Sequence, residues 1–302
     1  MKKIKFLIPI ILLVSLTWYL FLKPHDYIVR FKAKTSPGSL YTGVQEWNVI
    51  NQKLDSFSYK INDKKAYTLI SETINTNGMP LDLVWNFKSI NDSITHVVVG
   101  ITEKENSIFN RITVPFSNTK FKKTGLELIK RYKADINFQL NHQFKVTIVG
   151  LDTIPEIRYI YIDFKNIKMS NKATKMMESN ARLMQFLTEH DLKGGQFPFL
   201  IVNKWNLDQS IVDFRFCFPI KQIDSMPIHK DFKFDVLKPK KALKAIYYGN
   251  YKTSDRGWFA LHEYAKRHNI PLENNPMEIF YDNPFYGGDE LKWEAEVYLP
   301  IK

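Results

Sequence analysis

The sequence predicts an α+β protein in three parts: an N-terminal transmembrane helix, an antiparallel sheet domain that ends on a long helix, and a domain in which a strand-helix-strand-strand unit occurs twice. Three observations support this prediction. An uncharged segment follows a basic N-terminus, short β-rich runs alternate with turn residues, and two C-terminal stretches end in the same pattern. The predicted domains are residues 1–24, 25–143 and 144–302, with the two copies at about 144–223 and 234–302.

Composition excludes several classes of protein. The chain has 302 residues, 44% of them hydrophobic, which is enough for a large core and excludes both intrinsic disorder and a polytopic membrane protein. The only cysteine is Cys217, so an intramolecular disulfide and an all-cysteine metal cluster are excluded within the monomer. The seven histidines have no metal-ligand spacing, and no phosphate loop, dinucleotide fingerprint or Gly-x-Ser-x-Gly elbow occurs. We therefore expect no metal and no cofactor.

The net charge of +12 is spread along the chain. Basic groups occur at 120–123, 130–133 and 238–241, but no recognition helix, zinc-finger spacing or ribonucleoprotein motif accompanies them. Solvated faces explain these groups better than a nucleic-acid interface, so no nucleic-acid partner is expected.

The N-terminus has the pattern of a membrane anchor. Residues 1–5 contain three lysines, and residues 6–22 contain no charged side chain. Seventeen residues at about 1.5 Å each span about 26 Å, just enough for a bilayer core. Residues 18–22 offer no small residue for cleavage, which favours an anchor over a signal peptide; a buried core helix is the other alternative. The lysines before the segment predict a cytoplasmic N-terminus with the body outside the cytoplasmic membrane.

Strand and helix signals alternate after the anchor. Asn, Asp and Gly turn signals separate the β-rich runs, so an antiparallel meander is expected, and Asn118 can cap a long amphipathic helix. The predicted order is a strand at 26–35, short helices at 40–54, strands at 57–61, 66–74, 81–90, 94–102 and 107–115, and a helix at about 118–140.

This order resembles the START-like superfamily, also described as polyketide cyclase-like or SRPBCC. The resemblance implies a helix-grip fold, in which a curved sheet wraps the final helix and leaves a cavity for an apolar ligand. Trp47, Trp85 and Phe87 can equally fill that space as ordinary core. The resemblance covers 26–140 and rests on 27–37 (YIVRFKAKTSP), Gln45-Glu-Trp47 and the ending Arg111-Ile-Thr-Val114 with its long helix.

The C-terminal half contains one unit twice. The endings at 214–220 (FRFCFPI) and 295–301 (AEVYLPI) align position for position. The helix of the first copy, at 169–191, carries Ala173, Met176, Met177, Met184 and Leu187 on one side. The other predicted elements are strands at 157–164, 197–202 and 211–220, a link at 234–241, a strand at 242–249, a helix at 254–268, and strands at 277–281 and 291–301.

The second copy resembles the GyrI-like, or AraC-type effector-binding, domain, and with the first copy the resemblance covers about 146–302. It implies a ligand groove opposite the helices, between the two copies. It also implies that Glu296 faces a cationic or polar ligand and that Tyr281 is an aromatic wall. The motifs are Tyr248-Gly-Asn-Tyr251, the aromatic helix Trp258-Phe-Ala-Leu-His-Glu-Tyr264, Tyr281-Asp-Asn-Pro284, and Glu296 four residues before Pro300.

Alternation along the last strand predicts which face of the sheet is free. One side carries apolar residues that we expect to meet the helices, and the other side is available for a ligand. The apolar side is Leu291, Trp293, Ala295, Val297 and Leu299, and the polar side is Lys292, Glu294, Glu296 and Tyr298.

The candidate ligand contacts include the first copy's counterpart of Glu296, which is Arg215. If both side chains point into one groove, Arg215 neutralises the carboxylate and shifts the preference towards anionic or zwitterionic ligands. The alternatives are that Glu296 is an exposed residue paired with a lysine and that the tyrosines are core. The full candidate set is Glu296, Tyr281, Tyr298, Arg215, Tyr251 and Tyr247.

The predicted function is a membrane-anchored protein that senses, sequesters or carries an amphipathic or lipophilic small molecule in the GyrI-like groove, and in the START-like cavity if that cavity is open. One alternative, which the resemblance to the GyrI-like domain implies, is a hydrolase or cyclase that uses Glu296 and Tyr281 as acid and base. Another is a structural or docking membrane protein whose cavities are filled by side chains. The predicted partners are a small amphipathic molecule and the membrane through residues 6–22.

Overall fold

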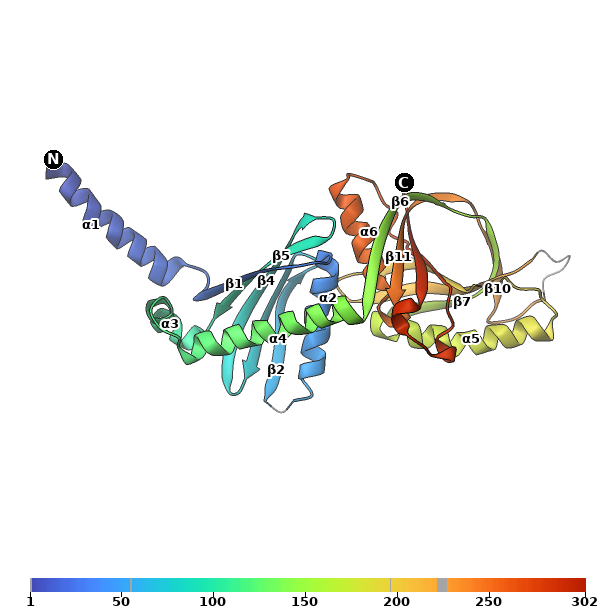
Figure 1. Ribbon diagram of the computed structural model, residues 1–302, viewed down its shortest axis with the longest axis horizontal. Coiled ribbons are helices and arrows are strands. Elements are labelled where there is room, and N and C mark those ends of the chain that lie inside the picture. Colours follow the sequence, from blue (N-terminus) through green and yellow to red (C-terminus); the bar gives the residue numbers. More distant parts are fainter. Residues whose placement is uncertain (1, 55, 196, 222–226) are drawn as a thin grey trace. The chain divides into compact units, whose positions relative to one another are not determined.

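The computed structural model describes residues 2–54, 56–195, 197–221 and 227–302 (Figure 1). The end of the predicted first copy, at residues 222 and 223, lies outside them. The predicted α+β class is confirmed, because helices accompany two antiparallel sheets. The chain divides into two compact units. Unit 1 is Met1–Ile90 with Ile94–Asn137, and unit 2 is Asn91–Ser93 with Phe138–Lys302.

Unit 1 is a five-stranded antiparallel sheet in the order β1-β5-β4-β3-β2. Strands β2 to β5 form the predicted meander, and β1 pairs with β5. Ser36 caps α2, since its Oγ accepts from the backbone N–H of Ser39 at 3.4 Å. The bounds are β1 (Tyr27–Ala33), α2 (Pro37–Asn51), β2 (Phe57–Lys65), β3 (Leu69–Thr76), β4 (Met79–Asn91), β5 (Ile94–Thr102), α3 (Ser107–Thr113) and α4 (Lys120–His142).

Aromatic side chains fill the interior between this sheet and α4. The Trp85 ring lies 4.9 Å from the Tyr132 ring of α4, and the Trp47 ring lies 5.4 Å from that of Phe57. Trp47, Trp85 and Phe87 are all at most 5% exposed. These three residues are therefore core.

The predicted strand at 107–115 is wrong, because Ser107–Thr113 forms the helix α3. Ser107 Oγ and Arg111 Nε both donate to one oxygen of the buried Asp26, at 2.5 and 2.8 Å. Four residues span about 6 Å in a helix and about 13 Å in a strand, so only a helix lets both side chains reach that oxygen. This tertiary contact overrides the β propensity of the segment.

The predicted transmembrane helix at 6–22 is not supported. Lys2–Thr17 forms α1, and Trp18–Leu22 continues it as the π-helical turn η1. Only residues 6–17 are both uncharged and α-helical, which corresponds to about 18 Å. Among the helices of the described chain, none is long and apolar enough to cross a membrane. The expectations of a membrane partner and of an orientation lose their support with it.

Unit 2 is an eight-stranded antiparallel sheet in the order β10-β7-β9-β8-β12-β13-β11-β6. The two predicted copies are β7-α5-β8-β9 and β11-α6-β12-β13. They meet at the β8–β12 pair, and the order β7-β9-β8 of the first copy is mirrored by β12-β13-β11 of the second. The bounds are β6 (Phe144–Ile154), β7 (Ile157–Lys168), α5 (Lys172–Glu189), β8 (Phe199–Asn206), β9 (Ile211–Pro219), β10 (Lys233–Leu237), β11 (Lys240–Gly249), α6 (Asp255–Arg267), β12 (Met277–Phe280) and β13 (Glu294–Pro300).

The predicted link at 234–241 contains a strand, β10, and this strand explains why the sheet curls. β10 pairs with β7 of the first copy, while β6 pairs with β11 of the second. Each of these edge strands then enters the opposite half of the sheet across two residues, 155–156 and 238–239. Three Cα steps of about 3.8 Å reach at most about 11 Å. The two edges must therefore approach each other, and the sheet curls around its helix-free face (Figure 1).

The predicted alternation of the last strand is confirmed over β13. Ala295, Val297 and Leu299 are fully buried in the core that includes Trp258 and Leu261 of α6. Glu294 and Glu296 pair in register with Tyr248 and Ile246. Because side chains alternate along a strand, these glutamates lie on the helix-free face.

Candidate ligand-binding site

The helix-free face of the unit 2 sheet is not an empty groove. Side chains from six strands and the end of β6 form a second buried cluster there, and the curl of the sheet encloses them. The groove predicted on this face is therefore largely filled. The cluster consists of Ile154, Tyr159, Tyr161, Phe199, Cys217, Ala242, Met277 and Tyr298.

Glu296 lies on this face with its charge compensated. Lys244 Nζ is 2.7 Å from its Oε1, and the Tyr298 hydroxyl donates to its Oε2 at 2.7 Å. Partial burial raises the pKa of Glu296, but the hydrogen bonds from Lys244, Tyr298 and Tyr281 outweigh burial, so its pKa is lowered. Its side chain is only 18% exposed. The structure thus brings together three of the six candidates, Glu296, Tyr281 and Tyr298, around a lysine.

Arg215 lies on the same face but is not paired with Glu296. Its Nη1 is 3.0 Å from Asp235 Oδ2, its Nε is 3.4 Å from Asp163 Oδ1, and its guanidinium covers the Tyr161 ring at 4.4 Å. In the sheet register Arg215 and Tyr298 are three strand spacings apart, or about 14 Å. The condition for neutralisation by Arg215 is therefore not met, and the cation next to Glu296 is Lys244.

The remaining two candidates lie on the helix side. Tyr247 is fully buried and its hydroxyl is 2.7 Å from Thr253 Oγ1, as expected of a core tyrosine. Tyr251 lies in the 3₁₀ turn η4 (Tyr251–Thr253), and its hydroxyl donates to the backbone oxygen of Glu294 at 2.7 Å. Unlike Tyr247, Tyr251 lines a cavity.

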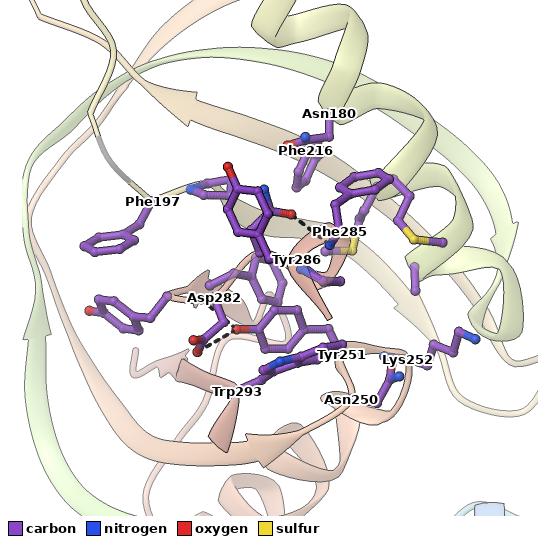
Figure 2. Close-up of a pocket in the computed structure, with 18 of the residues that line it drawn as sticks. Asn180, Phe197, Phe216, Asn250, Tyr251, Lys252, Asp282, Phe285, Tyr286 and Trp293 are labelled. Carbon is purple, nitrogen blue, oxygen red and sulfur yellow. Dashed lines mark hydrogen bonds between the residues drawn. The ribbon is translucent and has the colours of Figure 1, made fainter. Parts of the chain in front are cut away.

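This cavity, of about 810 Å³, opens beside α5 (Figure 2). One wall is the apolar side of α5. The facing wall comes from the second copy: η4, the end of β12 and the residue before β13. The α5 wall consists of Ala173, Met176, Met177, Asn180 and Met184, and the facing wall includes Tyr251, Phe280, Tyr281, Asp282 and Trp293.

Two aromatic residues at the rim are largely exposed to solvent. Phe285 and Tyr286 lie in the 3₁₀ turn η5 (Pro284–Tyr286) and are 62% and 88% exposed. Gly287 and Gly288 follow with φ of 66° and 99°, in the region that glycine favours. The two rings and the cavity lining together expose apolar surface to solvent at this rim.

Asp282 is the acidic side chain in the cavity wall. Its Oδ2 accepts from the backbone N–H of Glu294 at 2.7 Å, and its own backbone N–H donates to the Tyr251 hydroxyl at 3.0 Å. Figure 2 shows Asp282, Tyr251 and Trp293 on one side of the cavity. Lys252, the basic residue of the lining, is exposed.

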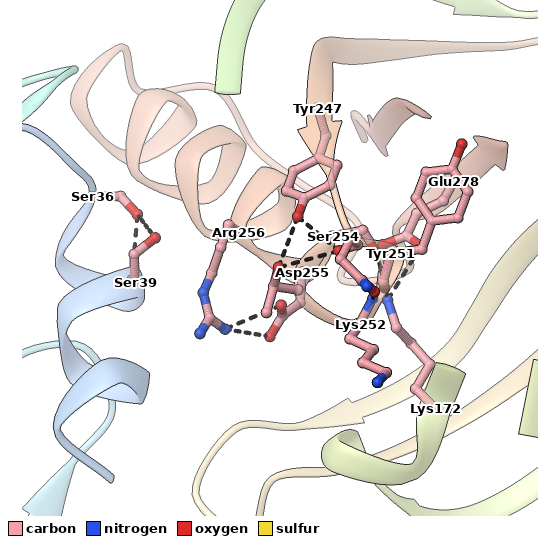
Figure 3. Close-up of polar contacts among 12 residues, drawn as sticks. Ser36, Ser39, Lys172, Tyr247, Tyr251, Lys252, Ser254, Asp255, Arg256 and Glu278 are labelled. Carbon is pink, nitrogen blue, oxygen red and sulfur yellow. Dashed lines mark hydrogen bonds and ion pairs between the residues drawn. The ribbon is translucent and has the colours of Figure 1, made fainter. Parts of the chain in front are cut away.

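A buried ionic cluster fixes the elements that form the two walls (Figure 3). Lys172, the first residue of α5, is 3.1 Å from Glu278 of β12 and 2.8 Å from Ser254, and all three side chains are fully buried. Burial raises the pKa of Glu278, and the nearby Lys172 opposes that shift. The cluster joins the start of α5 to the start of α6 and to β12, so it holds the walls in register.

Sequence reasoning found part of this site and missed the rest. The methionine side of α5 was recognised as one face, but it was not connected with a cavity. Asp282 lies inside the Tyr281-Asp-Asn-Pro284 motif, and an acidic residue in an aromatic motif was the signal that could have found it. In the described chain, no group of three or more His, Cys, Asp or Glu side chains is arranged to hold a metal ion.

Comparisons with known proteins concern the fold. No family model matches the chain, and no curated protein matches it. The C-terminal domain of EcmrR is similar at 18% identity over 53% of this chain and 98% of that chain, with a TM-score of 0.44. SAV2435 bound to tetraphenylphosphonium is similar at 14% identity over 52% and 94%, with a TM-score of 0.37.

A third neighbour is similar over more of the chain. BexL, a di-domain ARO/CYC protein of the BE-7585A biosynthetic pathway, has 8% identity over 91% of this chain and 85% of its own, with a TM-score of 0.27. All three similarities lie below 20% identity and below a TM-score of 0.5.

Proposed function

We propose that unit 2 binds an amphipathic small molecule in the cavity beside α5. The observation that supports this most is the cavity itself. A volume of about 810 Å³ lies within the range of small-molecule sites, and its lining combines methionine and aromatic side chains with few polar groups. Methionine is flexible and polarisable, so the α5 wall can adapt to ligands of different outline.

The proposal places the ligand on the helix side of the sheet and not in the groove predicted opposite the helices. Tyr251 and Tyr281 of the six candidates remain contacts in this proposal, because both line the cavity.

An enzymatic role for Glu296 and Tyr281 is the weaker candidate. Burial and the neighbouring Glu296 raise the pKa of Tyr281 to about 12, while that of Glu296 is lowered. At neutral pH the tyrosine therefore keeps its proton and the carboxylate holds none. Neither group has a pKa near the working pH, which efficient general acid-base catalysis requires.

The experiment is a titration with Nile red, a neutral dye whose emission rises in apolar surroundings. Asn180→Trp places a large side chain in the cavity, and Thr174→Trp adds the same side chain to the exposed side of α5. We expect wild type and Thr174→Trp to bind alike, and Asn180→Trp to bind at least about tenfold more weakly. Equal binding by all three proteins would place the dye outside this cavity and reject the proposal.

A further inference from the structure

We propose that α3 and the turn after it dock on the surface of a bilayer that contains anionic phospholipids. The docking face consists of Ile108, Phe109, Ile112 and Phe116. This inference goes beyond the proposed function, because it concerns unit 1 and not the cavity of unit 2. It also differs from the predicted anchor at 6–22, since α3 would lie in the plane of the membrane surface and would not cross the bilayer.

The docking face is a continuous apolar surface that water reaches. Ile108, Phe109 and Ile112 are 48%, 63% and 50% exposed, and Phe116 is 88% exposed. Residues three and four apart lie on one side of a helix, and the turn continues this spacing, since the N–H of Phe116 donates to the oxygen of Thr113 at 3.0 Å. Single exposed apolar side chains are common, whereas contiguous ones mark protein or membrane interaction surfaces.

Buried polar contacts on the inner side of α3 hold this face outwards. Arg111 and Asp26 are both buried, with Nε 2.8 Å from Oδ1, and Ser107 Oγ donates to the same oxygen. Arg111 Nη1 donates to the oxygen of Leu20 at 2.8 Å, and the Tyr19 hydroxyl donates to that of Arg111 at 2.9 Å. Turning the apolar side inwards would break this buried ion pair, which is costly.

Lysines next to the docking face give it the charge that anionic headgroups attract. Lys120, Lys122 and Lys123 form the first turn of α4, which begins four residues after the face ends (Figure 1). Within the described chain none of these three forms a salt bridge. The acidic residues closest in sequence, Glu103 and Glu105, lie at the other end of the face, before α3.

An anionic bilayer satisfies the apolar side chains and the lysines together. Acyl chains near the headgroups can accept the two phenylalanine rings, and lipid phosphates can pair with the lysines. The net charge of +12 adds long-range attraction to the same surface. A protein partner would need its own apolar groove with acidic groups on one side only, so the lipid surface is the simpler fit.

The test is fluorescence quenching on vesicles, with the full chain labelled beside the docking face. Ser117→Cys keeps all four apolar residues, and the native Cys217 is fully buried, so a thiol-reactive NBD dye labels position 117. The vesicles contain equal parts of phosphatidylcholine and phosphatidylglycerol, with a nitroxide quencher on the acyl chains. Ser58→Cys is the matched control, on a strand four spacings, or about 19 Å, from β1.

We expect quenching at position 117 to be at least about fivefold larger than at position 58. We also expect at least about tenfold weaker binding to vesicles of phosphatidylcholine alone, because those lack the anionic lipid.

Two phenylalanine variants assign the binding to α3, because α1 also exposes apolar side chains. Phe109→Ser removes a ring of the docking face. Phe138→Ser removes a ring that is 55% exposed and lies about 27 Å along α4 from its first residue. We expect about tenfold weaker vesicle binding for Phe109→Ser and less than about twofold for Phe138→Ser. An unchanged thermal unfolding midpoint shows that each variant is folded.

Several results would overturn the inference. Equal quenching at positions 117 and 58, or equal binding by the two phenylalanine variants, would place the membrane contact elsewhere in the chain. Equal affinity for both kinds of vesicle would reject the anionic lipid. A dimer that Phe109→Ser dissociates, without vesicle binding, would mean that a second copy covers the face. The Nile red titration tests the cavity separately, so none of these results decides the proposed function.

Discussion

The interiors of the two units differ, although helices pack on an antiparallel sheet in both. In unit 1 the space between the sheet and α4 is filled by rings such as Trp47, Trp85 and Tyr132, all at most 5% exposed. In unit 2 a cavity of about 810 Å³ remains beside α5. A shared layout of helix on sheet therefore does not decide whether a binding space exists; the side chains at the interface do.

The two helices of unit 2 show how this difference arises within one repeated fold. Gly257 brings α6 close to the sheet, since a Cβ atom there would lie 2.8 Å from Val297 Cγ2. Trp258 then fills the remaining space and is fully buried. α5 instead presents Met177 and Met184, which are 38% and 47% exposed and line the cavity. The two copies therefore differ in packing: α6 is packed against the sheet, and α5 has an accessible wall.

The largest expected effect comes from emptying the filled interior. Trp85→Ala removes a ring that is 1% exposed, and we expect a loss of about 3 to 5 kcal/mol in the free energy of unfolding, measured with denaturant. Trp18→Ala is the matched control, because Trp18 is 53% exposed and should cost little. A loss below about 1 kcal/mol at Trp85 would mean that the interior of unit 1 is not tightly filled.

The next effect concerns the carboxylate buried in that filled interior. Glu72 is fully buried and accepts from Trp85 Nε1 at 2.7 Å and from Asn48 Nδ2. Burial raises its pKa from 4.5 to about 7, and the hydrogen bonds from Trp85 and Asn48 only partly oppose this. The folded state holds the Glu72 proton more tightly than the unfolded state does. Protonated Glu72 therefore contributes fully to the free energy of unfolding below about pH 4.5, and this contribution is lost as the pH rises through about 7.

Glu72→Gln should remove this pH dependence. Between pH 4.5 and 8 the free energy of unfolding of wild type should fall by about 3 kcal/mol through the ionisation of Glu72. The variant should lack this contribution, because glutamine does not ionise. Thermal unfolding at a series of pH values measures the difference. Parallel pH profiles for the two proteins would show that Glu72 does not titrate in this range.

The smallest effect belongs to the open wall of unit 2. Met184→Ala should cost less than about 1 kcal/mol, since the side chain is already 47% exposed. Its neighbour Leu183 is fully buried, and Leu183→Ala should cost about 2 to 5 kcal/mol in the same denaturant experiment. Similar losses at the two positions would contradict the distinction between a packed side and a cavity side of α5.

Local patterns in the sequence were sufficient for most of the elements. Alternation placed Ala295 and Val297 on the helix side, and the aligned endings at 214–220 and 295–301 revealed the repeat, since both signals depend only on neighbouring residues. The helix α3 was missed because one oxygen of Asp26, 81 residues before Ser107, holds it in place. A contact of that range leaves no periodic signal.

The candidate site was recovered only in part for the same reason. Tyr251 and Tyr281, which line the cavity, were found by motif, but the helix-free face on which the groove was predicted is largely filled. That face is filled because the two-residue connections at 155–156 and 238–239 curl the sheet, and strand pairing across the copies is not visible in either copy alone.

By itself the sequence determined the α+β class, the doubled C-terminal unit and the division of β13 into an apolar and a polar side, because these follow from short-range periodicity and from internal similarity. The tertiary structure alone decided which carboxylate is paired with a lysine and which one lines the cavity. Lys244 meets Glu296 only because β11 pairs with β13 in one register, and Asp282 faces a cavity only because α5 stands opposite its loop. Charge pairing depends on distances across the fold, and no pattern along the chain encodes them.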